Sequence, residues 1–171
     1  MDCHNGSVSE TEPTPVEAVI DSPLKIQFET FIDQHRAQLR ECMAGLTEEQ
    51  ARRSLVVSRT TLLGLVKHVT LVEKVWFDEA VTGRSRAEIG ILDTPDESFV
   101  LTDEDTIESV RHGYQKACEA SRQATASLAL DDLVHGNRRG PLPLRWVYMH
   151  VLRETAQHCG HADILREQIV R

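Results

Sequence analysis

The C-terminal segment, residues 144–169, carries the residues best suited to chemistry. His150, Glu154 and His158 recur every four residues, and His161 follows three residues later. Spacings of three and four place side chains on one face of an α-helix, about 6 Å apart along its axis. A carboxylate and an imidazole at that spacing can bind the same divalent cation. We call these four residues the C-terminal polar group.

The flanking residues predict that Glu154, His158 and His161 point into the protein. Val147, Val151 and Leu165 share their helix face. Burying a carboxylate or an imidazole costs free energy unless the group is paired or bound to a ligand. The face therefore predicts either a bound ligand or a closed set of hydrogen bonds.

His68 is the residue that would complete a metal site. It lies between Leu65 and Val72 in a second apolar segment and could meet the C-terminal residues across a helical bundle. Ligands from only two helices leave coordination positions open for water or substrate, as in catalytic zinc sites. We predict that His68, Glu154 and His158 hold one divalent metal ion. A hydrogen-bonded polar cluster without a metal would give the same pattern.

The elements that must position these residues are helices. Apolar periodicity and the residue types at helix ends predict four long helices, over residues 23–45, 60–81, 102–128 and 143–168. A capping box of Thr47 and Gln50 predicts a short helix over residues 47–53. No segment predicts a strand. The first helix is expected to bury the face formed by Leu24, Phe28, Phe31, His35, Leu39 and Cys42. Because two connections are long, we expect an all-α chain folded as a four-helix bundle with crossovers.

The chain is long enough for one domain. We expect residues 1–22, rich in Ser, Thr, Pro and Glu, to be a disordered leader and residues 23–171 to form the domain. Cys3 and His4 in the leader cannot form a preorganised site. A domain of this size needs no metal for stability, so a metal site would be functional rather than structural.

Composition excludes several classes of protein. A formal charge of -8 argues against nucleic acid as a partner, and the pair Arg138 and Arg139 is interpreted as solvated loop residues. The four cysteines are scattered without a CxxC pair, which favours neither a zinc ribbon nor a disulfide framework. No apolar run approaches the roughly 18 residues of a membrane helix, and no signal peptide is evident, so we expect a cytoplasmic protein.

Two segments resemble a known family. TLLGLVKHVTLVEKVWF (residues 61–77) and RETAQHCGHADILREQI (residues 153–169) are similar to the DinB-like or YfiT-like family of metal-dependent four-helix bundles, particularly to its actinobacterial branch of mycothiol S-transferases. The likeness covers nearly everything after residue 22. It implies metal ligation by His68, Glu154 and His158. Many members have His in place of Glu154, whereas mycothiol-dependent relatives such as maleylpyruvate isomerase use Glu.

The resemblance also implies a reaction. A low-molecular-weight thiol, mycothiol or a similar compound, would be joined to an electrophilic small molecule in detoxification, with a metal-bound thiolate as nucleophile. Zn²⁺ is the expected metal, with Fe²⁺, Ni²⁺ or Mn²⁺ as alternatives. His161 would orient a ligand or water, bind the metal directly, or relay the released proton. His150 would support a ligand, or pack against its neighbours or lie at the surface, and the protein would form a homodimer.

Other interpretations use the same residues. Two histidines and one carboxylate are also the ligands of non-haem iron oxygenases. Alternatively, the chain is a non-catalytic bundle that binds a metal or a small molecule, with Trp76, Phe77 and Trp146 either lining a pocket or packing in the core. The candidate arginines for recognising a thiol cofactor are Arg59, Arg145 and Arg166.

Overall fold

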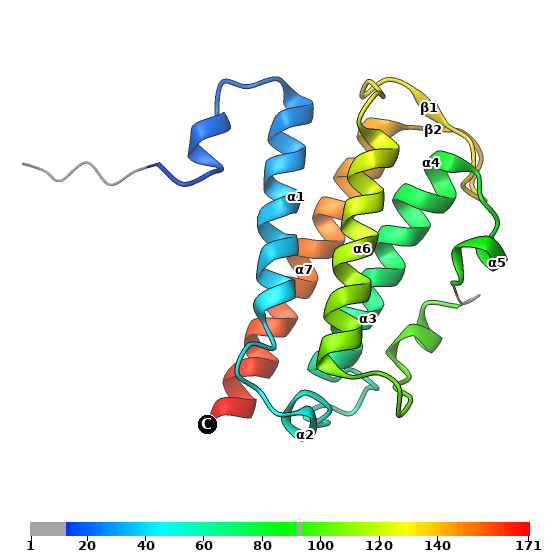
Figure 1. Cartoon of the computed structure of the whole chain (residues 1–171). Helices are drawn as coiled ribbons and strands as arrows, with labels where there is room; N and C mark the ends of the chain where they lie inside the picture. The colour runs from blue at the N-terminus through cyan, green and yellow to red at the C-terminus, as the bar shows by residue number, and fades with distance from the viewer. Residues whose placement is uncertain (1–12, 92–93) are drawn as a thin grey trace, which may run out of the picture.

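Helices make up most of the protein, as shown by a computed structural model that describes residues 13–91 and 94–171 (Figure 1). The long helical stretches are α1 (Leu24–Glu41), α3 (Leu62–Glu73) continued through a π-helical segment (Lys74–Glu79) into α4 (Ala80–Thr82), α6 (Ile107–Thr125) and α7 (Leu144–Val170). They lie side by side, with α1 and α3 each packed against both α6 and α7. Each long helix predicted from the sequence has a counterpart here.

Side-chain caps explain where the helices begin. The hydroxyl of Thr61 accepts a hydrogen bond from the first turn of α3, and Thr106 forms a capping box at the start of α6. The latter helix begins later than predicted, because Asp105 accepts hydrogen bonds from the backbone and the hydroxyl of Thr102 and closes a separate turn there. Gly83, with φ of 73°, ends α4 as the sequence predicted.

The connections between the long helices contain short elements. They are α2 (Glu48–Ala51), α5 (Arg86–Ile89), a 3-10 turn (Asp96–Phe99), and the strands β1 (Leu133–Val134) and β2 (Leu142–Pro143), which pair in antiparallel fashion. The capping box predicted at Thr47 and Gln50 is present at the start of α2. The expectation of no strand was wrong, because a two-residue strand is too short to show alternation in the sequence.

The described part of the predicted leader, residues 13–22, contains a 3-10 turn (Glu17–Val19). The backbone and hydroxyl of Thr14 donate to the carboxylate of Glu17 next to this turn. Cys3 and His4 lie outside the described residues. The division of the chain into a leader and one domain stays a prediction.

The buried face of α1 agrees with the predicted one only in part. Leu39 and Cys42 are buried as predicted, but Leu24 and Phe31 are exposed, and Ile32 and Arg36, which the prediction left out, are buried. The predicted face contained His35 but no charged side chain, whereas the observed face contains Arg36 at its centre. The apolar pattern therefore misplaced the first half of the buried face and placed its last turn correctly.

Neither a membrane helix nor a reactive thiol is found among the described residues. Within that part of the chain, no helix is both long and apolar enough to cross a membrane.

Cys42, Cys118 and Cys159 are free and buried. Burial raises the pKa of each thiol to about 12, so the thiols are protonated at neutral pH and are poor nucleophiles.

The core consists of two apolar clusters. The first includes Leu39, Val69, Tyr114 and Leu165, and the second includes Ile32, Val72, Phe77 and Val151. Each long helix also has a buried polar side chain close to the boundary between the two clusters. These side chains are Arg36 on α1, Glu73 on α3, Ser121 on α6 and Thr155 on α7. We call these four residues the central polar layer. Three of them are joined directly to one another.

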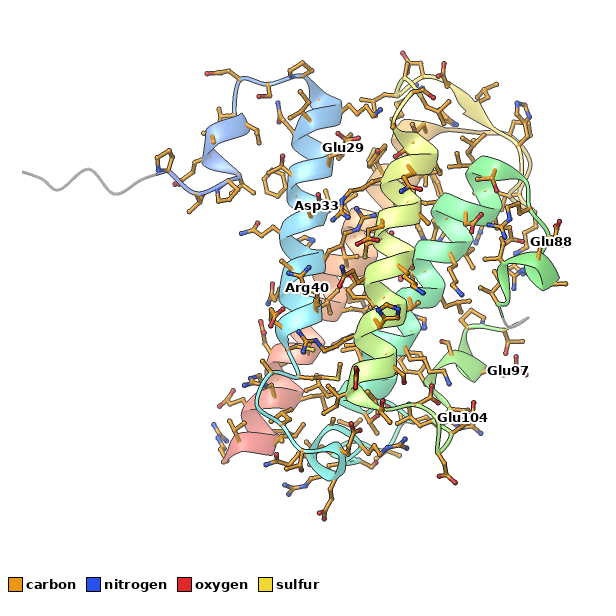
Figure 2. The ribbon with its side chains drawn as sticks, in the orientation of Figure 1. Glu29, Asp33, Arg40, Glu88, Glu97 and Glu104 are labelled. Atoms are coloured by element: carbon orange, nitrogen blue, oxygen red, sulfur yellow. The ribbon has the colours of Figure 1, made fainter. Side chains whose placement is uncertain are left out.

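Arg36 and Glu73 form a buried ion pair in the central polar layer. Nε and Nη2 of Arg36 donate to Oε1 and Oε2 of Glu73 at 2.8 and 2.6 Å. The hydroxyl of Ser121 also donates to Oε2, at 2.7 Å, and Nη1 of Arg36 donates to Asp33, which is labelled on α1 in Figure 2. Burial alone would lower the pKa of Arg36, but the carboxylate of Glu73 raises it above its ordinary value. The pair fixes α1, α3 and α6 relative to one another.

Removal of one partner of this pair should destabilise the protein strongly. In Arg36→Met, Glu73 would stay buried without a counter-charge, and we expect the free energy of unfolding to fall by about 3–5 kcal/mol in urea titrations followed by circular dichroism. Arg36→Met combined with Glu73→Leu should recover most of this loss, because no buried charge remains.

The matched control for this experiment is Arg40→Met, on the same helix (Figure 2). Arg40 pairs with Glu41 at the surface, and both side chains are about half exposed. The expected change is below about 1 kcal/mol. A loss in Arg36→Met no larger than that of the control would contradict the role given to the buried pair.

Candidate metal centre

His68, Glu154 and His158 come together where α3 lies beside α7. One ligand atom from each residue lies within 4.8 Å of the others. Nε2 of His158 is 3.8 Å from Oε2 of Glu154. The rings of His68 and His158 meet edge to face, with centroids 4.9 Å apart. These are the three residues that the sequence singled out, and their binding of a metal stays a prediction.

The tautomer of His68 is fixed by Ser98. Nδ1 of His68 lies 2.8 Å from Oγ of Ser98, whose hydroxyl donates to the carbonyl oxygen of Pro95. A hydroxyl has one proton, so Ser98 must accept from the Nδ1–H of His68. Nε2 then keeps its lone pair, as a metal ligand requires. Phe99 stacks on the same imidazole, with ring centroids 4.2 Å apart.

Gly64 allows the 3-10 turn to pack closely enough on α3 for Ser98 to contact His68. A Cβ at Gly64, one helical turn before His68, would lie 3.1 Å from the carbonyl oxygen of Phe99. The absence of a side chain therefore lets the turn pack closely on α3. Sequence reasoning missed Ser98, because it lies in a connection and no periodic pattern links it to a residue 30 positions earlier.

The three candidate ligands fit a divalent cation. Burial, with a contribution from the neighbouring His68, lowers the pKa of His158 to about 4. Burial likewise lowers the pKa of His68. Both imidazoles are therefore neutral at pH 7, which is the form that binds metals. Nδ1 of His158 is buried without a hydrogen-bond partner in the described part of the chain. Two imidazoles and one carboxylate suit Zn²⁺ and Fe²⁺ alike.

His161 and His150 occupy different surroundings. His161 is exposed, with its ring centroid 5.6 Å from that of His158, so the prediction that it points inward was wrong. His161 lies on α7 at the edge of the buried face, where its side chain is exposed to solvent. Nε2 of His150 lies 3.8 Å from Oε1 of Glu154. Its ring packs against both Trp76 and Trp146, with centroids 4.1 and 5.1 Å away, and these two rings also contact each other. His150 therefore packs next to a candidate ligand.

A pocket of about 210 Å³ opens beside these residues. Its lining combines polar residues with an apolar wall from α3 and the π-helical segment: His68, Leu71, Val72, Val75, Trp76, Glu79, Arg86, Pro95, Asn137, Arg138, Arg139, His150 and Glu154. Arg138 and Arg139 are exposed, as expected for loop residues, but they also line this pocket. No pattern in the sequence predicted that this loop would lie close to His68.

The other residues considered as pocket or cofactor contacts lie elsewhere. Phe77 is buried in the core. Arg145 is paired with Asp131, and Arg166 donates to the backbone carbonyls of Cys42 and Ala44. Arg59 lines a separate surface hollow. None of the three arginines proposed for thiol recognition lines the pocket beside His68 and Glu154.

Comparison with known protein families identifies a relationship. Residues 27–170 match the model of a family described as mycothiol-S-transferase. The matched range contains all three candidate ligands, Ser98 and the whole pocket lining. A search of curated proteins found no match to the chain.

The neutral state of His158 can be measured by NMR titration of the metal-free protein. We expect its imidazole to titrate near pH 4, against about 6.5 for a histidine in the unfolded chain. Because the pKa is depressed by folding, the unfolded chain binds this proton more readily, and the residue should reduce stability as pH falls from about 6.5 toward 4. His158→Gln should lose that part of the pH dependence. A midpoint above about pH 6 would contradict the buried, neutral ring.

Proposed function

The chain belongs to the mycothiol-S-transferase family, and on this premise we propose that it is a metal-dependent transferase with a four-helix-bundle fold. It would join mycothiol or a similar low-molecular-weight thiol to an electrophilic small molecule. The observation that carries the proposal is the convergence of His68, Glu154 and His158 inside the matched range and at the edge of a pocket.

The metal would be held by His68, Glu154 and His158. A bound Zn²⁺ ion would lower the pKa of a coordinating thiol from about 8.5 and so supply the thiolate at neutral pH. Ser98 holds the imidazole of His68 in the required tautomer. The pocket beside it would hold thiol and electrophile together, and its apolar wall would limit competing water.

A proton must leave when the thiol becomes a nucleophile. His161 is the candidate acceptor, because its imidazole is exposed and next to His158 and can pass the proton to solvent. Its position outside the ligand cluster suits a relay better than ligation. We further propose that the protein acts in detoxification as a homodimer, as expected from the resemblance.

A second candidate function follows from the same donors. Two histidines and one carboxylate also bind Fe²⁺ in oxygenases, so the identity of the metal separates the two chemistries. A transferase would work with Zn²⁺ under argon, whereas an oxygenase would need Fe²⁺ and oxygen. A binding protein without catalysis would retain ligand affinity after loss of the metal.

The metal content of the purified, untagged protein tests the proposal. We expect about one Zn²⁺ per chain by elemental analysis, and loss of both metal and thiol transfer in His68→Ala and in Glu154→Ala. His112→Ala, which removes an exposed histidine on α6, should change neither. Absence of metal after reconstitution would refute the site, and Fe²⁺ with oxygen-dependent turnover would favour the oxygenase.

Ser98→Ala tests the support of His68. Without the hydroxyl acceptor the imidazole is free to change tautomer and orientation, and we expect Zn²⁺ affinity to fall about 10–100-fold in competition with a chelator at constant pH. The control Ser54→Ala removes an exposed hydroxyl that donates to the backbone carbonyl of Val56, and it should retain the wild-type affinity. Equal affinity in Ser98→Ala would refute the role of Ser98.

A further inference from the structure

Two arginines at the pocket lack an acidic partner. Arg138 and Arg139 line it, and within residues 13–91 and 94–171 neither guanidinium forms an ion pair. The third arginine of the lining, Arg86, differs because it donates to both carboxylate oxygens of Glu79, at 3.1 and 3.2 Å. The other carboxylate of the lining, Glu154, pairs with Arg153 at 2.6 Å and lies 3.8 Å from His158. Among the described residues the lining therefore holds three arginines against two carboxylates and carries a net positive charge.

The loop that carries these arginines is anchored to the end of α4. The backbone N–H of Gly136 donates to the carbonyl oxygen of Ala80 at 3.0 Å. A Cβ at Gly136 would lie 1.9 Å from the carbonyl oxygen of Glu79, so only glycine permits this approach. Asn137 is buried, and its Oδ1 accepts from the backbone N–H of Arg139 at 2.9 Å. These contacts of Gly136 and Asn137 hold the loop, and with it Arg138 and Arg139, at the pocket.

Arg139 is also oriented by an aromatic contact. Its guanidinium carbon lies 5.5 Å from the ring centroid of Trp76, which in turn packs on His150. A guanidinium placed over an aromatic face keeps its N–H groups free at the edge, where they can donate to a carboxylate. Beside it, Leu71, Val72 and Val75 supply the apolar wall.

We propose that Arg138 and Arg139 form a subsite for the carboxylate of an acidic electrophile, whose apolar body packs on the α3 wall beside the metal ligands. The assignment to the electrophile rests on the proposed transferase function. Paired guanidiniums bind carboxylates in bidentate fashion, and such charge-assisted hydrogen bonds exceed neutral ones in strength. The enzyme therefore prefers electrophiles that carry a carboxylate next to a small apolar or aromatic group.

Binding to the metal-free protein tests the subsite without catalysis. The probes are benzoate and its neutral counterpart benzamide, followed by fluorescence of Trp76 and Trp146, the two tryptophans of the chain. In Arg138→Gln/Arg139→Gln we expect the dissociation constant of benzoate to rise about ten-fold or more, and its preference over benzamide to disappear. Chelation of the metal excludes binding of the carboxylate to a bound ion.

Two further variants separate the subsite from general effects of charge. Arg53→Gln removes an exposed arginine next to α2, at the opposite end of the molecule from β1 and β2 (Figure 1), and should leave benzoate binding unchanged. Gly136→Ala keeps both arginines but forces the loop away, and it should weaken benzoate binding as the double variant does. Benzoate affinity that is equal in the double variant and the wild type would overturn the proposal.

Turnover by the zinc-loaded protein tests the assignment to the electrophile. With mycothiol as the constant thiol, the electrophiles are 4-chloro-3,5-dinitrobenzoate and neutral 1-chloro-2,4-dinitrobenzene. In each reaction a C–S bond forms, the C–Cl bond breaks with its electron pair leaving as chloride, and the thiol proton passes to solvent. The ratio of kcat/KM for the acidic over the neutral electrophile should fall at least about ten-fold in Arg138→Gln/Arg139→Gln and stay constant in Arg53→Gln.

The two experiments distinguish failure of the subsite from failure of the proposed function. Arginine-dependent benzoate binding without thiol transfer would keep the carboxylate subsite and refute the transferase. Thiol transfer with the same electrophile ratio in every variant would keep the transferase and refute the assignment of Arg138 and Arg139 to the electrophile.

Discussion

The buried ion pair between Arg36 and Glu73 is the interaction on which the arrangement of the helices depends. It joins α1 to α3, and Ser121 extends it to α6. Glu73 has no exposed surface, so separating the pair would leave a charge inside the protein, and the helices cannot slide or rotate independently. Glu73 lies five residues after His68 on the same helix. The pair that fixes α3 thus also fixes the direction in which His68 points.

The central polar layer and the candidate metal centre are adjacent to each other on α7. His35 on α1 bonds to Thr155 on α7, one residue after Glu154 and one turn before His158. Both faces of α7 at this level are therefore polar, one toward α1 and the other toward α3. Apolar clusters above and below supply most of the burial, while the polar contacts between them define one relative position of the helices.

The helices and the connections contribute different parts of the site. Helices α3 and α7 present the three candidate ligands from rigid backbone, as a precise geometry requires. The connections add what surrounds them: the 3-10 turn brings Ser98 to His68, and the loop between β1 and β2 brings two arginines to the pocket. Each connection reaches its position through a glycine, Gly64 or Gly136, that allows close approach of two backbones. This division lets the loop between β1 and β2 vary without disturbing the ligands, whereas the 3-10 turn is tied to His68 through Ser98.

The sequence by itself indicated the helices and the three candidate ligands, because helices and shared helix faces follow from local periodicity. Residues four apart on a helix share a face whatever the rest of the fold does, so Glu154 and His158 could be paired from spacing alone. His68 was added from its place between Leu65 and Val72 in a second apolar helix, and the resemblance implied the same three ligands. Spacing could not reveal the partners of those residues. The ion pair of Arg36, the contact of Ser98 with His68 and the placement of Arg138 and Arg139 join positions far apart in the chain. The tertiary structure alone decided these contacts, since they depend on which helix faces and which connections meet in space.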